Sequence, residues 1–330
     1  MTASQADQRR DLTLDDSYTE DAAMSVCLKR AKVAAATDLP VLILGESGTG
    51  KTLLARAIHN SSSRAARPFI SFNSGGLSDT LLDSQLFGHE RGAFTGAHHG
   101  LKGKFELADR GTLFIDEIAD MSSDAQGKIL RAVEYGEFER LGSEVARVAD
   151  VRLISATHQA LSQLSKTERF RRDLFFRISG IVLTIPPLRE RLRDLPLLVA
   201  MEIGRAAREQ QKTIVGLDKA AADRIFNHSW PGNLRELNRV IRTAVALATE
   251  NVIDPETLLL EPLSSSAANE PAAGSDGEIL TLAEVERQHI VRVLERFGGN
   301  KRRAARALDV SRSTLDRKLA APSDAAAARH

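Results

Sequence analysis

The chain has 330 residues with a formal net charge of +1, and 42% of its residues are hydrophobic. This length favours about two domains, the apolar content supports globular cores, and the near-neutral charge excludes a polycation, so any nucleic-acid surface is expected to be local. The single cysteine, Cys27, excludes an internal disulfide and a cysteine metal cluster and suits a reducing cytoplasm. No apolar run of about 18 residues and no signal peptide are visible, which predicts a cytoplasmic protein without a membrane partner.

Composition and pattern divide the chain into segments. Residues 1–12 are polar, and we expect them to be disordered. Strand and helix patterns alternate over residues 13–187, which predicts an α/β domain built on a doubly wound parallel sheet. Residues 188–262 are predicted to form a helical lid, because apolar residues recur there at helical spacing. This repeat consists of Leu237, Val240, Ile241, Ala244 and Leu247.

The first motif is a phosphate-binding loop. It follows an apolar run at residues 41–44, which predicts a buried strand, and precedes residues 53–58, which have helical apolar spacing. The pattern G-x-x-x-x-G-K-[ST] is met in full by Gly45, Glu46, Ser47, Gly48, Thr49, Gly50, Lys51 and Thr52. Backbone N–H groups and the helix start bind the phosphates, Lys51 is expected to reach their oxygens, and Thr52 to ligate Mg²⁺. We therefore predict ATP and Mg²⁺ as cofactors; a glycine-rich turn with a solvated lysine is the alternative.

A hexapeptide bracketed by glycines follows this loop and precedes the next acidic motif. Its residues are Gly92, Ala93, Phe94, Thr95, Gly96 and Ala97. The glycines, with one aromatic ring and one hydroxyl, predict a mobile loop with an exposed Phe94 at its tip. We expect the nucleotide state to raise or lower that tip. An ordinary surface turn is the alternative.

Residues 111–115 predict a second buried strand, which ends in the carboxylates of Asp116 and Glu117. We expect Asp116 to hold Mg²⁺ through its waters and Glu117 to polarise the water that attacks the γ-phosphate. A strand that ends in a solvated acidic pair is the alternative, which the preceding phosphate loop disfavours.

The C-terminal part carries a second kind of signal. Residues 263–277 predict a linker and residues 321–330 a disordered tail. Residues 278–320 predict a small all-α domain in which a tight turn joins two helices, as in a helix-turn-helix. The side chains left available for DNA are Arg312, Ser313, Arg317 and Lys318. A solvated basic helical hairpin is the alternative.

The hexapeptide GAFTGA at residues 92–97, between two nucleotide motifs, resembles the signature of bacterial activators of sigma-54 RNA polymerase, the enhancer-binding proteins of the AAA+ class. The resemblance covers nearly the whole chain. It implies an AAA+ P-loop NTPase with a helical lid and a C-terminal helix-turn-helix of the Fis type. Within that helix-turn-helix it adds the DNA-binding residues Lys301, Arg302, Arg303 and Thr314.

Local matches to this family imply further roles. Asn73 resembles the strand-end asparagine that holds the catalytic glutamate inactive until the γ-phosphate is sensed. Arg171 and Arg177 resemble two arginine fingers that reach the neighbouring subunit's nucleotide. Arg235 resembles the second sensor of the lid, and Thr157 occupies the first-sensor position. The alternatives are that Asn73 is a turn former, that Arg171 and Arg177 are surface arginines, and that the segment of Arg235 is merely the start of a helix.

Three residues depart from the family's pattern. Thr52 stands where an acidic residue is usual, and His158 stands where asparagine follows the sensor threonine. Asp316 stands where the family favours an aromatic residue.

The resemblance implies an ATP-hydrolysing activator that binds upstream enhancer DNA, forms a homo-oligomeric ring, expected to be hexameric, and remodels the closed complex of the sigma-54 RNA polymerase holoenzyme. Two alternatives belong to other classes. A DNA-binding repressor with a vestigial ATPase is disfavoured by the intact hexapeptide, and a remodelling ATPase for replication or unfolding is disfavoured by the hexapeptide and the helix-turn-helix. Only about a dozen polar residues precede the ATPase, too few for a sensing domain, so we expect a trans-acting regulatory protein.

Overall fold

The computed structural model describes residues 12–260 and, in the C-terminal part, residues 290, 294, 300, 301, 303, 305 and 314–316. The chain divides into two compact units, residues 1–260 and 261–330. The predicted linker and tail lie outside the described residues, as do residues 1–11. Leu12 is described, and its carbonyl accepts a hydrogen bond from the amide of Asn60, so this residue belongs to the ordered ATPase unit.

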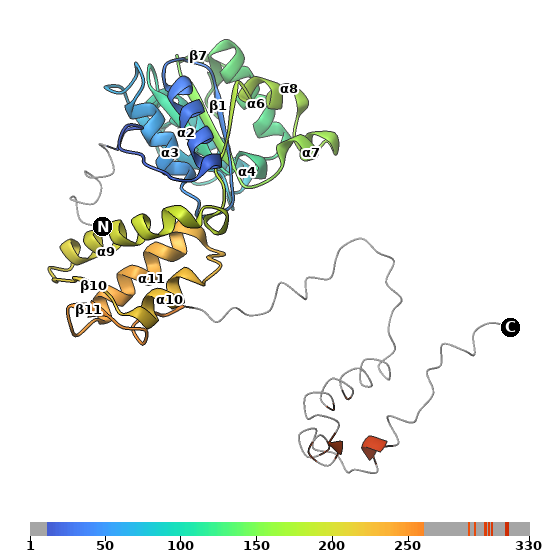
Figure 1. Cartoon of the computed structure of the whole chain (residues 1–330). Coiled ribbons are helices and arrows are strands. Elements are labelled where there is room, and N and C mark those ends of the chain that lie inside the picture. Colours follow the sequence, from blue (N-terminus) through green and yellow to red (C-terminus); the bar gives the residue numbers. More distant parts are fainter. Residues whose placement is uncertain are drawn as a thin grey trace. The chain divides into compact units, whose positions relative to one another are not determined.

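Five parallel strands form one sheet in the order β2-β5-β8-β1-β9 (Figure 1). Their bounds are β1 Val41–Leu44, β2 Phe69–Asn73, β5 Thr112–Asp116, β8 Arg152–Thr157 and β9 Ile181–Thr184. Because all strands run the same way, their carboxyl ends lie along one edge, which is where ligands bind in such sheets. The strands expected at residues 41–44 and 111–115 are β1 and β5.

Helices cover both faces of this sheet. On β5 the side chains alternate: Leu113 and Ile115 enter one apolar core, and Phe114 enters the other. All three are fully buried, which explains why the strand is a continuous apolar run. One face is covered by α2 (Ala22–Ala35) and α3 (Lys51–Asn60); the other is covered by α4 (Asp79–Phe87), α6 (Ser123–Tyr135) and α8 (Arg172–Ile178). The prediction of a doubly wound parallel sheet is confirmed.

Two hairpins are inserted into this alternation. Strands β3 (Gly88–His89) and β4 (Leu101–Lys102) pair between α4 and α5 (Lys104–Leu107). Strands β6 (Glu137–Glu139) and β7 (Ala146–Val148) pair between α6 and β8. The hexapeptide at residues 92–97 lies in the connection from β3 to β4. The short elements that complete this domain are η1 (Ile118–Asp120) and α7 (Leu161–Lys166).

The helical lid has its own core around Trp230, which is fully buried and donates its indole N–H to the carbonyl of Ile225. All five residues of the predicted apolar repeat lie in α11; four are buried, and Leu247, the last residue of the helix, is 50% exposed. The lid consists of η2 (Leu188–Glu190), η3 (Leu192–Asp194), α9 (Leu195–Glu209), β10 (Gly216–Leu217), α10 (Lys219–Phe226), α11 (Asn233–Leu247) and β11 (Val252–Ile253). Among the described residues, no helix is both long and apolar enough to cross a membrane.

Candidate functional site

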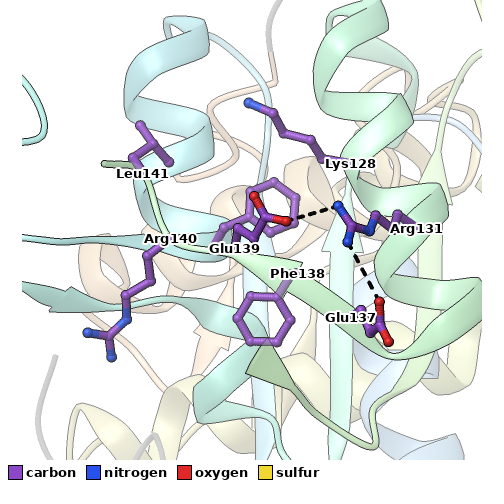
Figure 2. Close-up of a pocket in the computed structure, with 8 residues that line it drawn as sticks. Lys128, Arg131, Glu137, Phe138, Glu139, Arg140 and Leu141 are labelled. Carbon is purple, nitrogen blue, oxygen red and sulfur yellow. Dashed lines mark hydrogen bonds and ion pairs between the residues drawn. The ribbon is translucent and has the colours of Figure 1, made fainter. Parts of the chain in front are cut away.

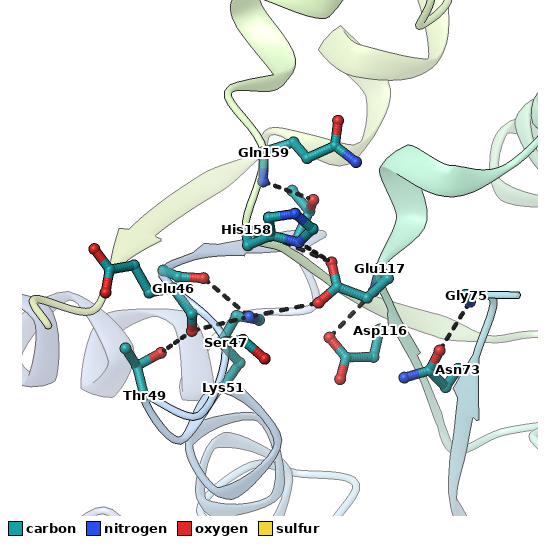
Figure 3. A network of polar contacts seen from close by, with 12 residues as sticks. Glu46, Ser47, Thr49, Lys51, Asn73, Gly75, Asp116, Glu117, His158 and Gln159 are labelled. Atoms are coloured by element: carbon teal, nitrogen blue, oxygen red, sulfur yellow. Dashed lines mark hydrogen bonds and ion pairs between the residues drawn. The ribbon is translucent and has the colours of Figure 1, made fainter. Parts of the chain in front are cut away.

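The phosphate loop connects the end of β1 to the start of α3, as the sequence predicts. Gly48 and Gly50 have φ angles of +81° and +103°, a region that only glycine adopts freely. Lys51, at the first position of α3, is 6% exposed and donates from Nζ to the carbonyls of Gly45 at 2.9 Å and Glu46 at 3.2 Å. The loop therefore curls around its lysine with its backbone turned inwards (Figure 3).

The lid contacts the same loop. The Glu46 carboxylate accepts two hydrogen bonds from Arg189, at 2.8 and 2.6 Å, and one from Asn233 at 3.2 Å. The Arg189 guanidinium holds the pKa of Glu46 below its usual value. Arg235, the predicted second sensor, donates to the hydroxyl of Ser47 at 2.8 Å. Arg189 and Asn233 were missed by sequence reasoning, since nothing local to either residue indicates a partner more than 140 positions away.

A second joint links the lid to the segment before α2. The Asp194 carboxylate accepts hydrogen bonds from the hydroxyl of Thr19 at 2.7 Å and the amide of Glu20 at 2.8 Å. Arg191, one turn earlier and 5% exposed, donates to the carbonyl of Thr49 in the phosphate loop at 3.3 Å. Residues 19–20, the start of the lid and the phosphate loop thus meet at one place.

The acidic pair lies at the carboxyl end of β5. The strand register aligns Asn73 of β2, Asp116 of β5 and Ala156 of β8. Burial raises the pKa of Asp116, which the positive charge of Lys51 opposes. Glu117 has a φ angle of +56°, and the hydroxyl of Ser74 donates to the carbonyls of both acidic residues, at 3.0 and 2.7 Å. Ser74 thus supports a strained turn, a role that sequence reasoning missed.

The Glu117 carboxylate has two partners. One oxygen lies 2.8 Å from Nδ1 of His158, and the other lies 3.8 Å from Nζ of Lys51. The side-chain oxygen of Asn73 instead accepts the amide N–H of Gly75 at 2.8 Å. None of the contacts given for the described residues joins Asn73 to Glu117, and the switch role of Asn73 stays a prediction (Figure 3).

The predicted first sensor, Thr157, is fully buried at the end of β8. Its hydroxyl accepts the amide N–H of Gln159 at 3.0 Å, and its carbonyl accepts the amide N–H of Gly45 at 3.3 Å. The side-chain amide of Gln159 donates to Asp120 at 2.7 Å. The end of β8 is thereby fastened both to the phosphate loop and to the turn after β5.

Of the two arginines proposed as fingers, Arg171 is the N-cap residue of α8 and Arg177 lies in its last turn. Arg171, which is 44% exposed, pairs with Asp173 at 2.7 Å, and this ion pair lowers the pKa of the aspartate. Arg177 donates to the carbonyls of Val133 and Glu134 in the last turn of α6, at 3.3 Å each. Phe176, between them, is 75% exposed. None of the contacts given for the described residues joins either arginine to its own chain's phosphate loop.

Turns close the hexapeptide. The amide N–H of Gly92 donates to the carbonyl of Ala97 at 2.9 Å, and the amide N–H of Ala97 donates to the carbonyl of Phe94 at 3.0 Å. Phe94 is partly buried, and its ring lies edge-on to His89 with a centroid distance of 5.0 Å. The expectation of an exposed aromatic tip is therefore wrong, because His89 covers part of the ring. Thr95 is exposed, whereas Ala97 is buried and presents no side chain to a partner.

The base of the hexapeptide loop contacts the other hairpin. The amide N–H of Glu90 donates to the carbonyl of Leu141, and the amide N–H of Leu141 donates to the carbonyl of Gly88, both at 3.0 Å. Arg140 ion-pairs with Glu90 at 3.0 Å and with Glu106 at 2.7 Å. We call these contacts the hairpin joint. Sequence reasoning missed it, because it depends on the packing of two separate insertions.

A cavity of about 300 Å³ lies beside the hairpin joint, under the β6–β7 hairpin (Figure 2). Among its charged lining residues, Arg131 contacts Glu139 at 3.0 Å and Glu137 at 3.6 Å. Phe138, 4% exposed, packs against Phe87 and Phe105. None of the residues that line this cavity belongs to the nucleotide motifs.

Few of the predicted DNA-binding residues are described. Lys301 ion-pairs with Asp316 at 2.7 Å, and the side chain of Asn300 accepts the amide N–H of Arg303 at 3.2 Å, as an N-cap does. Leu315 is fully buried. Thr314 is helical. The remaining candidates lie outside the described residues: Arg302, Arg312, Ser313, Arg317 and Lys318.

A phosphate loop after the first strand, an acidic pair at the end of another strand and a helical lid resting on the loop define an AAA+ P-loop ATPase. Family models agree along the chain: the Sigma-54 interaction domain matches residues 18–184, the AAA+ ATPase lid domain residues 189–275, and the Fis family of bacterial regulatory proteins residues 281–321. The chain belongs to the sigma-54 activator family, and the predicted resemblance is confirmed.

Individual relatives extend this match. The chain is 44% identical to the transcriptional regulatory protein ZraR of Klebsiella oxytoca over 90% of its own length and 67% of the relative's. It is 41% identical to the regulatory protein AtoC of Escherichia coli K12, over 90% of its length and 65% of that protein's. The chain thus spans about two thirds of the length of these curated relatives. The structure of NtrX from Brucella abortus in complex with ATP superposes with a TM-score of 0.69 at 31% identity, covering 96% of this chain and 71% of that one.

Proposed function

We propose that this chain is an ATP-driven transcriptional activator. It binds upstream enhancer DNA, assembles into a hexameric ring and uses the loop at residues 92–97 to remodel the closed complex of the sigma-54 RNA polymerase holoenzyme, which opens the promoter. The observation that carries the proposal is the hairpin joint, which ties that loop to the β6–β7 hairpin. This hairpin leads directly into β8, whose end contacts Glu117. A change at the nucleotide can therefore reach the loop through a short stretch of chain.

The donor set fits Mg²⁺. Burial raises the pKa of Asp116, so a divalent cation beside it would favour its charged form, and Thr52 offers an exposed hydroxyl in the first turn of α3. Thr52 and Asp116 would hold the ion together with water and phosphate oxygens. When bound, the ion neutralises charge on the phosphates.

The chain's own residues then divide the work. Backbone N–H groups of the loop, Lys51 and Arg235 bind the phosphates. Glu117 accepts a proton from the attacking water as the water oxygen bonds to the γ-phosphorus and the bond from that phosphorus to the ADP oxygen breaks, which releases ADP and phosphate. Thr157, which is bonded to the loop through Gly45, couples the end of β8 to the nucleotide.

The surface of α8 supports the ring. Arg171 and the large apolar ring of Phe176 are exposed there, and no contact within the described residues directs Arg171 to its own nucleotide site. We infer that Arg171 and Arg177 complete the site of the neighbouring subunit. Breaking the pair of Arg171 with Asp173 would free its guanidinium for that neighbour.

The C-terminal unit supplies the DNA contact in this proposal. The family match to residues 281–321 and the buried Leu315 support a folded helix-turn-helix. Removing residues 263–330 should abolish binding to the enhancer and spare ATP hydrolysis, which filter binding and phosphate release measure side by side. Unchanged enhancer affinity in the shortened protein would reject this placement.

The central experiment measures ATP hydrolysis and sigma-54 promoter opening in one preparation. Thr95→Ala should keep hydrolysis and abolish opening, because Thr95 is exposed at the loop and touches no nucleotide residue. Thr213→Ala, which alters another exposed threonine in the lid, is the matched control and should keep both activities. A wild-type protein that hydrolyses ATP but opens no sigma-54 promoter would refute the proposal.

A further inference from the structure

His158 departs from the family's pattern and lies in direct contact with the predicted catalytic base. It follows Thr157, the last residue of β8. The parallel register sets Asp116, the last residue of the neighbouring strand β5, beside Ala156, so Glu117 and His158 both lie just beyond the ends of adjacent strands. Nδ1 of the imidazole lies 2.8 Å from one Glu117 oxygen, and the backbone N–H of the same histidine lies 3.4 Å from it. Because a carboxylate only accepts, Nδ1 carries the proton and donates it.

The carboxylate is thereby held in one direction. Its second oxygen lies 3.8 Å from Nζ of Lys51, the lysine that binds phosphate oxygens, and the side chain of Glu117 is 17% exposed. Asn73 is turned towards the amide of Gly75, so the only side-chain hydrogen bond given to this carboxylate in the described structure comes from His158 (Figure 3).

The ring of His158 is itself held. Its neighbour Gln159 is fastened by two hydrogen bonds, from its amide N–H to Thr157 and from its side chain to Asp120. The imidazole is about half exposed, and its Nε2 has no hydrogen-bond partner among the described residues. The ring is therefore attached to a fixed stretch of backbone, and its one hydrogen bond goes to Glu117.

We propose that His158 is a positioning residue for the catalytic base: its Nδ1–H bond holds the Glu117 carboxylate facing the phosphate-binding lysine. The inference rests on the proposed ATP hydrolysis. The family resemblance implies that Asn73, at the end of β2, restrains the catalytic base. In this proposal the restraint comes instead from the end of β8, which also carries the sensor threonine. The base then follows any movement of β8 directly. Its orientation, rather than the affinity for ATP, depends on the histidine.

The test compares substitutions that keep or remove a donor at this place. In His158→Ala, kcat for ATP should fall on the order of 10- to 100-fold, since a base displaced by about 1 Å loses up to this much, while the Kd for ATP stays unchanged. His158→Asn should retain most of the activity, because its amide nitrogen is the same number of bonds from Cα as Nδ1. His158→Gln, whose amide lies one bond further out, should behave like the alanine variant.

Gln163→Ala is the matched control, because it alters an exposed side chain of the following helix, α7, and should keep the wild-type kcat. Equal losses in His158→Ala and His158→Asn would show that the histidine is merely structural and would overturn the inference. Full activity in His158→Ala, in a preparation whose wild type hydrolyses ATP, would overturn it as well.

A second readout does not depend on activity. In ¹⁵N-histidine-labelled protein without nucleotide, the signal that His158→Ala removes should be that of a protonated Nδ1, and Glu117→Ala should shift it. A bare Nδ1, or a signal that Glu117→Ala leaves unmoved, would overturn the inference. A wild type that hydrolyses no ATP would refute the proposed function instead, and the protonated Nδ1 would still establish the contact.

Discussion

The nucleotide edge of the sheet and the loop at residues 92–97 are built in different ways. At the edge, Glu46 is bonded to residues of the lid and Glu117 to the residue that follows the neighbouring strand β8, so the partners are far apart in sequence. The loop is closed by turns between neighbours, and Thr95 at its tip is exposed. The first region can hold atoms in place for chemistry, whereas the second can move at low cost.

The hairpin joint connects the loop to the β6–β7 hairpin, which precedes β8 in the chain. Backbone hydrogen bonds fix the base of the loop to Leu141, and Arg140 adds ion pairs to Glu90 and Glu106. The Glu90 and Arg140 side chains are partly buried, so their pairing is less screened by salt than a surface pair. The loop is thus free at its tip and fixed at its base, which is what a part that transmits a displacement requires.

The largest effect should come from the phosphate loop. Lys51→Ala should lose ATP binding, because the lysine is the buried cation of the loop and nothing nearby can replace it. Isothermal titration with a slowly hydrolysed ATP analogue measures this. Lys32→Ala, on the exposed side of α2, is the control and should bind as the wild type does. If Lys51→Ala bound the ATP analogue with wild-type affinity, the assignment of this edge of the sheet as the nucleotide site would be wrong.

The acidic pair should separate binding from chemistry. Glu117→Ala should bind ATP and hydrolyse it about 10²–10⁴-fold more slowly, because the water loses its proton acceptor. Phosphate release under saturating ATP gives the rate, and the titration above gives the affinity. Normal turnover would mean that another group accepts the proton.

The subunit interface should show a smaller, concentration-dependent effect. If Arg171 completes a neighbour's site, specific activity should rise with protein concentration over the assembly range, and Arg171→Ala subunits should inhibit wild-type partners when the two are mixed. Arg172→Ala, its neighbour in sequence, serves as the charge control. Specific activity that is independent of dilution, together with additive rates on mixing, would contradict the shared site.

The hairpin joint can be loosened by a single methyl group. Gly142 has a φ of +75°, and a Cβ there would come within 2.8 Å of the Cβ of Ala93. Gly142→Ala should therefore cost about 1–2 kcal/mol of unfolding free energy and should lower promoter opening more than ATP hydrolysis. Gly204→Ala, in α9 with open space around it, should be neutral or stabilising. Urea unfolding and the paired activities test both variants; an equal loss of opening and hydrolysis would argue against a joint that serves only the loop.

The smallest effect concerns acid sensitivity of the α/β domain. His59, which is 2% exposed, lies with Nδ1 2.9 Å from the hydroxyl of Thr112, and burial lowers the pKa of its imidazole below the usual value of about 6.5. Below about pH 6.5 the imidazole is protonated in the unfolded state but stays neutral in the folded state. The stability that this neutral histidine contributes is therefore complete above about pH 6.5 and is lost as the pH falls towards the folded pKa. His59→Gln should flatten the decline in unfolding free energy below that pH. An identical decline in the variant would assign the acid sensitivity to other groups.

The sequence was sufficient wherever function depends on neighbours in the chain. The run from β1 through the phosphate loop to Lys51, and the strand that ends at Asp116, can be read from spacing and apolar pattern alone. The lid repeat was also readable, and all five of its residues lie in α11.

The sequence was insufficient wherever a side chain chooses among partners. Asn73 and His158 both stand at strand ends near Glu117, and only the structure shows that a local turn takes up the asparagine while the histidine reaches the carboxylate. Phe94 was predicted to be exposed because its neighbours are small, but His89, five residues earlier and held by Ser84, covers part of its ring. Which partner a side chain contacts depends on distances of a few ångströms, and these cannot be deduced from the spacing of residues in the sequence.

The joint at Asp194 has a mechanical consequence. Thr19 and Glu20 pull on its carboxylate, and Arg191, whose carbonyl accepts the amide of Asp194, holds the carbonyl of Thr49. A displacement of residues 19–20 would therefore act on the start of the lid and on the phosphate loop together. We expect the contact between lid and loop to depend on the position of this short segment as well as on the nucleotide.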